Sequence, residues 1–400
     1  IAEHKIELEV KELESTKFRT AAQVIATAGI FTVLLFMGMQ FTVHHFMSKQ
    51  SLVFPAIILS IVLLYHVLID RTLISHKNNW IVIGPLLLFT TYYVFNINRS
   101  APLKLEYIAY FLLIVALFTA IVFFKNKIVD KRMWIIFTFI YANVFFLPTL
   151  LSINKLIATN SNGIIALLLL FFCLINLHEK NIILKVMNLY TTILLVVTLF
   201  TATSRTAMMA FIIVIFVFFV IKYLSRFTFQ LLTALILLSP VVTSIYVYLK
   251  HTSIGQNLNN ISLQVTGKKF FSGRDRIWGE AVETVLQKDA FWTGLGINTE
   301  FQDLGGYLHN LYVQVFYQTG FIGLAFVVVL LLSFARTIGK AKVWDTDSRV
   351  LIGYFIAILF LQVFEGHLIY KFEIISVLMW IIIAFLIRKS SLPLSQEQKS

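Results

Sequence analysis

Long apolar stretches recur along the whole sequence and constrain its fold more than any other feature. A hydrocarbon core about 30 Å thick is crossed by about 20 apolar residues of helix, and about twelve stretches fit this template. They span residues 21–43, 51–69, 79–97, 105–124, 133–153, 163–177, 182–201, 207–224, 229–249, 311–334, 350–369 and 372–387. Only 13% of residues are charged, against about a quarter in soluble proteins. We therefore predict an all-α polytopic membrane protein with about twelve transmembrane helices.

Basic residues are unevenly divided between successive short loops, which predicts how the helices are oriented. Lys and Arg resist translocation, so loops rich in them stay in the cytoplasm. The richer loops and ends contain Lys17, Arg19, Arg71, Lys77, Lys125, Lys127, Lys131, Arg132, Lys180, Lys185, Lys222, Arg226, Arg336, Lys340, Lys342, Arg349, Arg388 and Lys389. The poorer loops contain Lys49, Arg99, Lys104, Lys155, Arg205 and Lys371. We expect both chain ends in the cytoplasm and residues 250–308 on the outer face.

The segment 250–308 is a long polar interruption between two apolar stretches, and its acidic and basic residues nearly balance. Within it, residues 276–289 (RIWGEAVETVLQKD) place several apolar side chains on one helical face. These are Ile277, Ala281, Val282, Val285 and Leu286. The spacing predicts an amphipathic helix lying on the membrane body or its surface. Glycines at 294, 296, 305 and 306 then indicate a turning loop before the chain re-enters the bilayer.

The sequence also excludes several classes of function. The net charge of +13 is scattered between apolar stretches, which argues against nucleic-acid binding. The single cysteine, Cys173, lies in an apolar run, so the chain has no internal disulfide or cysteine metal site. We find no metal-ligand cluster, P-loop or dinucleotide fingerprint, and we expect no metal and no cofactor. No cytoplasmic segment is large enough to bind a nucleotide sugar, so a transferase of this kind takes its donor from the membrane.

Arginines at the predicted outer helix ends are candidates for function, because charges beside hydrocarbon are costly. Arg205 follows Ser204 in a short outer turn without an acidic neighbour, so an anion is its natural partner. The alternative is an interfacial arginine that extends to water and anchors its helix. Arg274 and Arg276 stand at the start of the amphipathic helix, where free amides and guanidinium groups favour a diphosphate. Alternatively, Asp275 or Glu280 neutralises one of these arginines locally, and Arg276 is the one this explanation suits.

Two further outer positions carry histidines. His309 and Asn310 come directly before an apolar stretch, and an imidazole takes up a proton near neutral pH. His309 is the best candidate for a general base, although an interfacial hydrogen-bonding role is the ordinary alternative. Glu365 and His367 lie in the short outer turn between the last two apolar stretches. They are predicted to support the site, and a local salt-bridge cluster explains them equally well.

Four segments occur in a distinctive order along the chain. They are SRTAMMAFIIV from Ser204, SGRDRIW from Ser272, GLGIN from Gly294 and HNLYVQVFYQTGFIGL from His309. In these motifs, including the Gly-x-x-Gly pair at 320 and 323, the sequence resembles the O-antigen ligase and polysaccharide polymerase superfamily. The similar stretch runs roughly over 182–332, about a third of the chain.

The resemblance implies a GT-C-like glycosyltransferase of the bacterial cytoplasmic (inner) membrane, with its active site on the outer side. Such enzymes transfer an undecaprenyl-diphosphate-linked glycan to an acceptor glycan or glycolipid, without a metal and with inversion. By position, Arg205 and Arg274 match the diphosphate-binding arginines, with Arg276 and Asn310 as additional substrate-binding residues. His309 matches the base that deprotonates the acceptor hydroxyl. A flippase and chain-length regulators are the implied protein partners.

Three functions stay open at this stage. Richness in Ile, Phe, Asn and Lys is typical of low-GC genomes and favours a polymerase, whose acceptor is a second lipid-linked repeat unit. A ligase, which transfers the glycan to lipid A core or another surface molecule, is the first alternative. A twelve-helix transporter or flippase is the second, although no half repeat is evident. We expect a polar segment 1–20, transmembrane helices over 21–181 and 335–389, a catalytic region 182–334 including loop 250–308, and a tail 390–400.

Overall fold

The structure is a computed structural model, and it describes most of the chain. The described residues are 27–39, 53–69, 80–96, 105–123, 131–151, 159–267, 269–271, 273–297, 299, 301, 308–339, 345–370 and 373–391. The predicted N-terminal segment 1–20 and nearly all of the tail 390–400 lie outside these residues.

Helices are the only regular secondary structure in the part of the chain that is described. Besides the helix Thr27–Met39, they are α2 (Val53–Ile69), α4 (Trp80–Phe95), α5 (Leu105–Phe123), α6 (Lys131–Tyr141), η3 (Ala142–Phe146), α7 (Leu147–Leu150), α8 (Thr159–Leu174), α9 (Ile182–Thr201), α10 (Arg205–Val220), η4 (Ser225–Phe227), α11 (Thr228–Leu249), α12 (Ser253–Thr266), α13 (Arg274–Gln287), α14 (Leu311–Gly339), α15 (Thr346–Phe364), α16 (His367–Tyr370) and α17 (Ile374–Ser391). Every predicted apolar stretch overlaps one of these helices.

Within the described part of the chain, six segments are long and apolar enough to cross a membrane. They are Leu105–Val122, Arg132–Leu150, Ile182–Thr201, Ser225–Leu249, Leu311–Gly339 and Thr346–Phe364. Five shorter apolar helices accompany them, at Thr27–Met39, Val53–Leu64, Trp80–Phe95, Asn160–Leu174 and Arg205–Val220. The chain is therefore a polytopic membrane protein.

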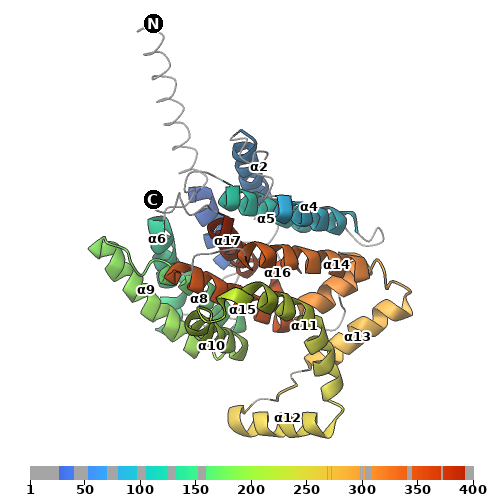
Figure 1. Cartoon of the computed structure of the whole chain (residues 1–400). Helices are drawn as coiled ribbons and strands as arrows, with labels where there is room; N and C mark the ends of the chain where they lie inside the picture. Colours follow the sequence, from blue (N-terminus) through green and yellow to red (C-terminus); the bar gives the residue numbers. More distant parts are fainter. Residues whose placement is uncertain are drawn as a thin grey trace, which may run out of the picture.

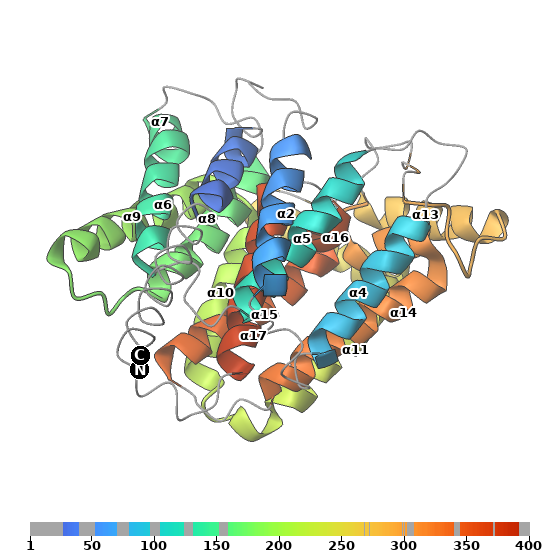
Figure 2. The ribbon, with the colours of Figure 1, turned by 90° about the horizontal axis from the view of Figure 1, so that it is seen from above.

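The centre of the bundle is formed by α15 and α17 (Figures 1 and 2). In α15, 78% of the spanning residues are buried, against 22% in α11, so α15 is a core helix and α11 lies at the periphery. α15 packs against α8, α10, α11, α14 and α17, and α4 runs along α14. Cys173 is buried among these helices as a free thiol.

One end of the bundle gathers basic residues from separate helices. The Lys389 ammonium lies 2.6 Å from the Asp345 carboxylate, which joins the end of α17 to the start of α15. Arg388 donates a hydrogen bond to the carbonyl of Ile121 (2.9 Å), and Arg349 lies over the Phe218 ring. These residues belong to the predicted basic loops, so those loops meet at the same end.

Helix α14 is interrupted where the chain after α13 runs against it. Gly320 has a φ of 65° and Gly294 has a φ of 69°. A Cβ at Gly320 would lie 2.4 Å from the backbone of Trp292, so only glycine fits at this contact. The backbone amide of Leu295 donates to the carbonyl of Tyr317 (2.9 Å). The GLGIN motif and the first glycine of the Gly-x-x-Gly pair therefore hold this loop against the broken helix.

A polar network fixes the same contact from the side of α4. Tyr93 donates to the Gln318 side chain (2.6 Å), and Gln318 donates to the carbonyl of Ile297 (2.9 Å). Asn96 donates to the carbonyl of Thr293 (2.5 Å). Residues about 200 positions apart in sequence are thus held together by hydrogen bonds.

The segment 250–308 contains the predicted amphipathic helix and one helix that was not predicted. α13 begins at Arg274, two residues before the predicted start, and buries Ile277, Trp278, Ala281 and Val285. The predicted face was partly wrong, because Val282 and Leu286 are 37% and 52% exposed, whereas Trp278 is buried. α12 stands away from the bundle (Figure 1). Its sequence also places apolar residues at helical spacing, at Ile254, Leu258, Ile261 and Val265, and this pattern was overlooked among the Asn-rich positions.

Candidate functional site

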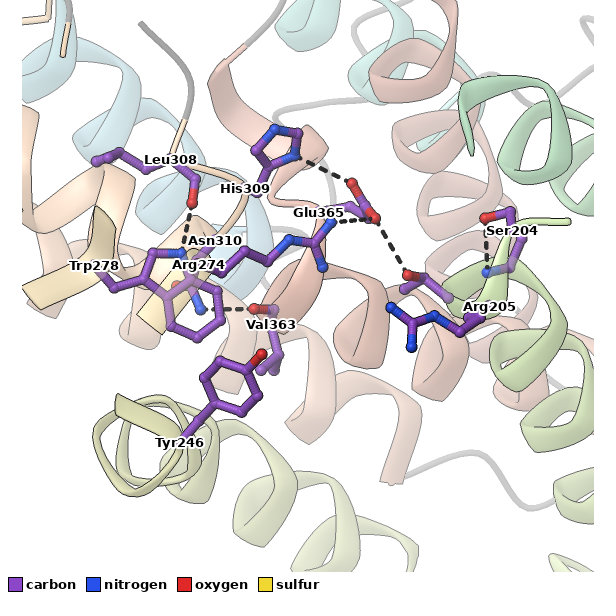
Figure 3. Close-up of polar contacts among 12 residues, drawn as sticks. Ser204, Arg205, Tyr246, Arg274, Trp278, Leu308, His309, Asn310, Val363 and Glu365 are labelled. Atoms are coloured by element: carbon purple, nitrogen blue, oxygen red, sulfur yellow. Dashed lines mark hydrogen bonds and ion pairs between the residues drawn. The ribbon is translucent and has the colours of Figure 1, made fainter. Parts of the chain in front are cut away.

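A single buried carboxylate, that of Glu365, stands at the centre of the site (Figure 3). Its Oε1 lies 2.8 Å from Nη2 of Arg274, and its Oε2 lies 3.3 Å from Nδ1 of His309. The hydroxyl of Thr206 donates to Oε1 over 3.2 Å. Thr206 lies at the start of α10, Arg274 at the start of α13, and His309 two positions before α14. Three separate segments therefore meet at the end of α15.

The electrostatics of the cluster keep Glu365 ionised. Burial by itself raises the pKa of this carboxyl, since its side chain is only 3% exposed. The hydrogen bond from His309 and the positive charge of Arg274 outweigh burial and lower the pKa to about 2. An ionised carboxylate only accepts hydrogen bonds, so Nδ1 of His309 is the donor in this pair. In the neutral imidazole the lone pair then resides on Nε2.

His309 occupies a strained position at the mouth of the site. Its φ of 51° lies in the left-handed region, which non-glycine residues rarely adopt. Its side chain is 35% exposed, whereas that of Arg274 is 17% exposed. His309 is therefore the member of the cluster most accessible to a molecule arriving from outside, while Glu365 lies behind it.

Asn310 locks the backbone next to His309. Its side-chain amide donates to the hydroxyl of Thr243 (3.0 Å) and to the carbonyl of Val363 (2.7 Å). Its Oδ1 accepts the backbone amide of Val313 (3.0 Å) at the start of α14. Asn310 is fully buried, so the structure gives this predicted substrate-binding residue a positioning role between α11, α14 and α15.

Trp278 fixes the other side of the His309 segment. Its indole Nε1 donates to the carbonyl of Leu308 (2.6 Å), and the side chain is fully buried. Lys250 at the end of α11 contacts the buried carboxylate of Asp275, which ties α13 to α11. The helix that carries Arg274 is thereby held against the site from both sides.

Arg205 approaches the cluster from α10. Ser204 caps this helix, its hydroxyl accepting the backbone amide of Ala207 (3.4 Å). The guanidinium of Arg205 is exposed and donates to the carbonyl of Lys269 over 3.4 and 3.5 Å. Among the described residues, no carboxylate forms an ion pair with Arg205, whereas Arg274 is neutralised by Glu365. Arg205 is thus the open positive charge beside the cluster.

Arg276 lies away from the Glu365 cluster, whereas the charge of His367 contributes to lowering the pKa of Glu365. Nε of Arg276 lies 3.6 Å from Oε1 of Glu280, and the Arg276 side chain is 65% exposed. Glu280 therefore neutralises Arg276 locally, as the alternative explanation predicted. His367 lies 3.7 Å from the carboxylate of Glu373, and both side chains are buried. The sequence therefore predicted three arginines for the site, and the structure brings two of them, Arg205 and Arg274, towards Glu365. It missed Thr206, Thr243 and Trp278, whose roles depend on partners far along the chain.

Taken together, the helices and the cluster define a polytopic membrane protein with an Arg-Glu-His site at one end of its bundle. Among the described residues no group of three His, Cys, Asp or Glu side chains is placed to hold a metal ion. Residues 190–328 match a family model described as O-Antigen ligase. The chain therefore carries a domain of the O-antigen ligase family, as its motifs suggested, in about a third of its length.

The presence of this family domain implies a membrane enzyme of surface polysaccharide synthesis that transfers glycans. No curated protein sequence matches the chain. The matched region contains Arg205, Arg274 and His309, and Glu365 lies beyond it. The carboxylate that joins Arg274 to His309 is thus contributed from outside the family domain.

Proposed function

We propose that this protein is a polysaccharide polymerase that joins undecaprenyl-diphosphate-linked repeat units at the outer face of the cytoplasmic membrane. The observation that carries the proposal is the contact of one buried carboxylate, Glu365, with both the cation of Arg274 and the partly exposed His309. A base and anion-binding groups side by side are what glycosyl transfer from a diphosphate-linked donor requires.

In the proposed reaction His309 acts as the general base. Nε2 takes the proton of an acceptor hydroxyl, whose oxygen attacks the anomeric carbon of the donor glycan. The bond from that carbon to the phosphate oxygen breaks with inversion, and the diphosphate leaves with the electron pair. Glu365 holds the imidazole in one orientation and stabilises the imidazolium that forms, since the carboxylate stays charged.

The two arginines have different parts in this scheme. Arg205 carries no carboxylate ion pair among the described residues and offers its guanidinium directly to the leaving diphosphate. Arg274 is shared with Glu365, and its charge balances the carboxylate while the donor is absent. When a diphosphate binds, Arg274 is close enough to the cluster to take part in stabilising the developing negative charge.

The proposed topology places this site outside the cell. About twelve transmembrane helices, with both chain ends in the cytoplasm, put the basic cluster of Arg349, Arg388 and Lys389 on the inner side. The site then lies on the outer side. Arg205, Arg274 and His309 belong to a catalytic region 182–334 that follows transmembrane helices over 21–181, and Glu365 comes from the segment 335–389 that follows it. Periplasmic or extracellular labelling of a cysteine introduced at Asn257, on α12, tests this orientation.

A purified-protein assay tests the function. Reconstituted protein receives its lipid-linked repeat unit as the only glycan, and the products are separated by size. A ladder of longer chains supports a polymerase. If the substrate stays unchanged until lipid A core or another acceptor is added, the result supports a ligase. The description of the matched family also favours a ligase.

A further inference from the structure

Helix α12 carries an apolar stripe that the described part of the protein leaves uncovered. The stripe consists of Ile254, Leu258, Ile261 and Val265, which lie within about 60° of one another at about 100° per residue. Ile254, Ile261 and Val265 are 63%, 56% and 78% exposed. Among the described helices none packs along α12, which stands apart from the bundle in Figure 1. An exposed apolar surface of this kind indicates a partner other than the described residues.

Both ends of α12 are held close to the bundle. The helix begins at Ser253, four residues after the membrane-spanning helix α11 ends at Leu249, a separation of at most about 14 Å. After α12, the backbone amide of Phe270 donates to Oδ1 of Asn259 (3.0 Å), and the carbonyl of Phe270 accepts from the hydroxyl of Tyr246 on α11 (3.1 Å). The helix is therefore tied at both ends beside the end of a membrane span.

The charges around α12 favour an anionic surface. Residues 250–274 contain Lys250, Lys268, Lys269 and Arg274 and no Asp or Glu, and α12 itself carries no charge. Lys250 and Arg274 are paired with carboxylates, whereas Lys269 is exposed beside the end of α12. The other sides of the helix are formed mainly by Asn, Gln and Ser. Helices that lie in the membrane interface combine such an apolar face with basic residues that attract anionic lipid headgroups.

We propose that α12 is an interfacial helix whose apolar stripe docks on the bilayer surface beside the site, with anionic headgroups near Lys269. With the proposed topology, this surface is the outer leaflet of the cytoplasmic membrane. At about 1.5 Å per residue the helix covers about 21 Å of it. A second copy of the chain fits the stripe less well, because two segments that are both basic and without an acid repel each other.

Docking of α12 also affects the site. The carbonyl of Lys269, next to the anchored Phe270, accepts hydrogen bonds from the guanidinium of Arg205 over 3.4 and 3.5 Å. The position of α12 on the lipid surface therefore helps to fix the orientation of Arg205.

Nitroxide labels on opposite sides of α12 test the docking in the full chain. Cys173 is fully buried, so a cysteine introduced at the surface is labelled selectively. Ile254→Cys and Ile261→Cys place the label on the stripe. Gln256→Cys is the matched control, because Gln256 is exposed and lies about 200° from Ile254 around the helix. Each protein is reconstituted at one copy per nanodisc in phosphatidylethanolamine with phosphatidylglycerol, and the collision rates of the label with oxygen and with a water-soluble nickel chelate are measured.

The labels at positions 254 and 261 are expected to collide severalfold more with oxygen, which concentrates in lipid, and severalfold less with the nickel chelate than the label at position 256. Equal collision rates with the nickel chelate at all three positions would overturn the proposal, because the stripe would then lie in water. Spin–spin broadening at positions 254 and 261 with two copies per nanodisc would assign the stripe to a second copy of the chain and would also overturn it.

A label at Val265→Cys gives a second measurement. The double substitution Ile254→Ser and Ile261→Ser is expected to move this label from lipid into water, whereas Gln256→Ser with Gln264→Ser leaves it in lipid. Replacing phosphatidylglycerol by phosphatidylcholine is expected to raise its collision rate with the nickel chelate, because Lys269 then loses its anionic partners. An unchanged rate after the stripe substitutions would contradict docking by the stripe, and an unchanged rate after the lipid exchange would contradict the role of anionic headgroups. These readouts need no turnover, so they stand or fall independently of the proposed reaction.

Discussion

Replacing Glu365 by Gln removes one negative charge with little change in shape, and its effect follows from the contacts of this carboxylate. Glu365 accepts from Arg274, His309 and Thr206. Breaking a buried ion pair by removing one partner costs about 3–5 kcal/mol. Because Arg274 remains 17% exposed, we expect the lower end of this range, a destabilisation of about 3 kcal/mol.

The same substitution is expected to reduce glycan transfer more than donor binding. Without the carboxylate, His309 loses the group that orients its ring and stabilises the imidazolium, and general-base catalysis contributes about 10²–10⁴ in rate. We therefore expect kcat to fall at least about 100-fold while KM for the donor changes little. Initial rates of chain extension by reconstituted protein measure both constants, and thermal unfolding in detergent measures the loss of stability.

The pH dependence of stability supplies a further check on the same residue. Because the folded protein lowers the pKa of Glu365 to about 2, its contribution to stability is complete above about pH 4.5 and is lost as the pH falls towards 2. Glu280→Gln is the control, since its partner Arg276 is exposed and such a pair contributes at most about 1 kcal/mol. A Glu365→Gln protein with wild-type kcat and stability would refute the reasoning.

Three other substitutions have clear expected outcomes. Gly320→Ala should destabilise the protein by about 3 kcal/mol in detergent unfolding, because φ is 65° at this position and the new Cβ would meet the loop backbone. Gly84→Ala is the control and should be tolerated, because no atom lies within 4 Å of the Cβ that it adds. Trp278→Phe should cost about 1–3 kcal/mol by leaving the buried Leu308 carbonyl unpaired, and a wild-type melting temperature would count against this. Arg205→Ala should raise KM for the donor about 10–100-fold, and unchanged saturation kinetics would remove it from the diphosphate site.

The helices were predictable because the bilayer sets their length and composition. Apolar runs of about 20 residues are visible without any knowledge of packing, and the predicted stretches overlap the observed helices. α12 was predictable from the apolar spacing of Ile254, Leu258, Ile261 and Val265, but its Asn-rich sequence was taken as part of the polar loop. The buried face of α13 was assigned partly to Val282 and Leu286, which are exposed, whereas the buried indole of Trp278 reaches the Leu308 carbonyl. That contact depends on a partner 30 residues away and cannot be read from spacing.

The chemistry of the site was predictable in type and less so in arrangement. Arg205, Arg274 and His309 stood out as charged or titratable residues at predicted outer helix ends, and the structure brings Arg274 and His309 onto one carboxylate. Glu365 was predicted only as a supporting residue, because it lies 91 positions from Arg274 and 56 from His309. Asn310 was predicted to bind substrate, but its side chain is occupied by Thr243, Val363 and Val313.

The most direct test of the account is chain extension by His309→Gln protein compared with wild type, each reconstituted with the lipid-linked repeat unit as the only glycan. Glutamine keeps a hydrogen-bonding side chain but cannot take up the hydroxyl proton. The account predicts a ladder of longer glycans from wild type and a rate at least about 100-fold lower from His309→Gln. A ladder of the same length and rate from both proteins would contradict it.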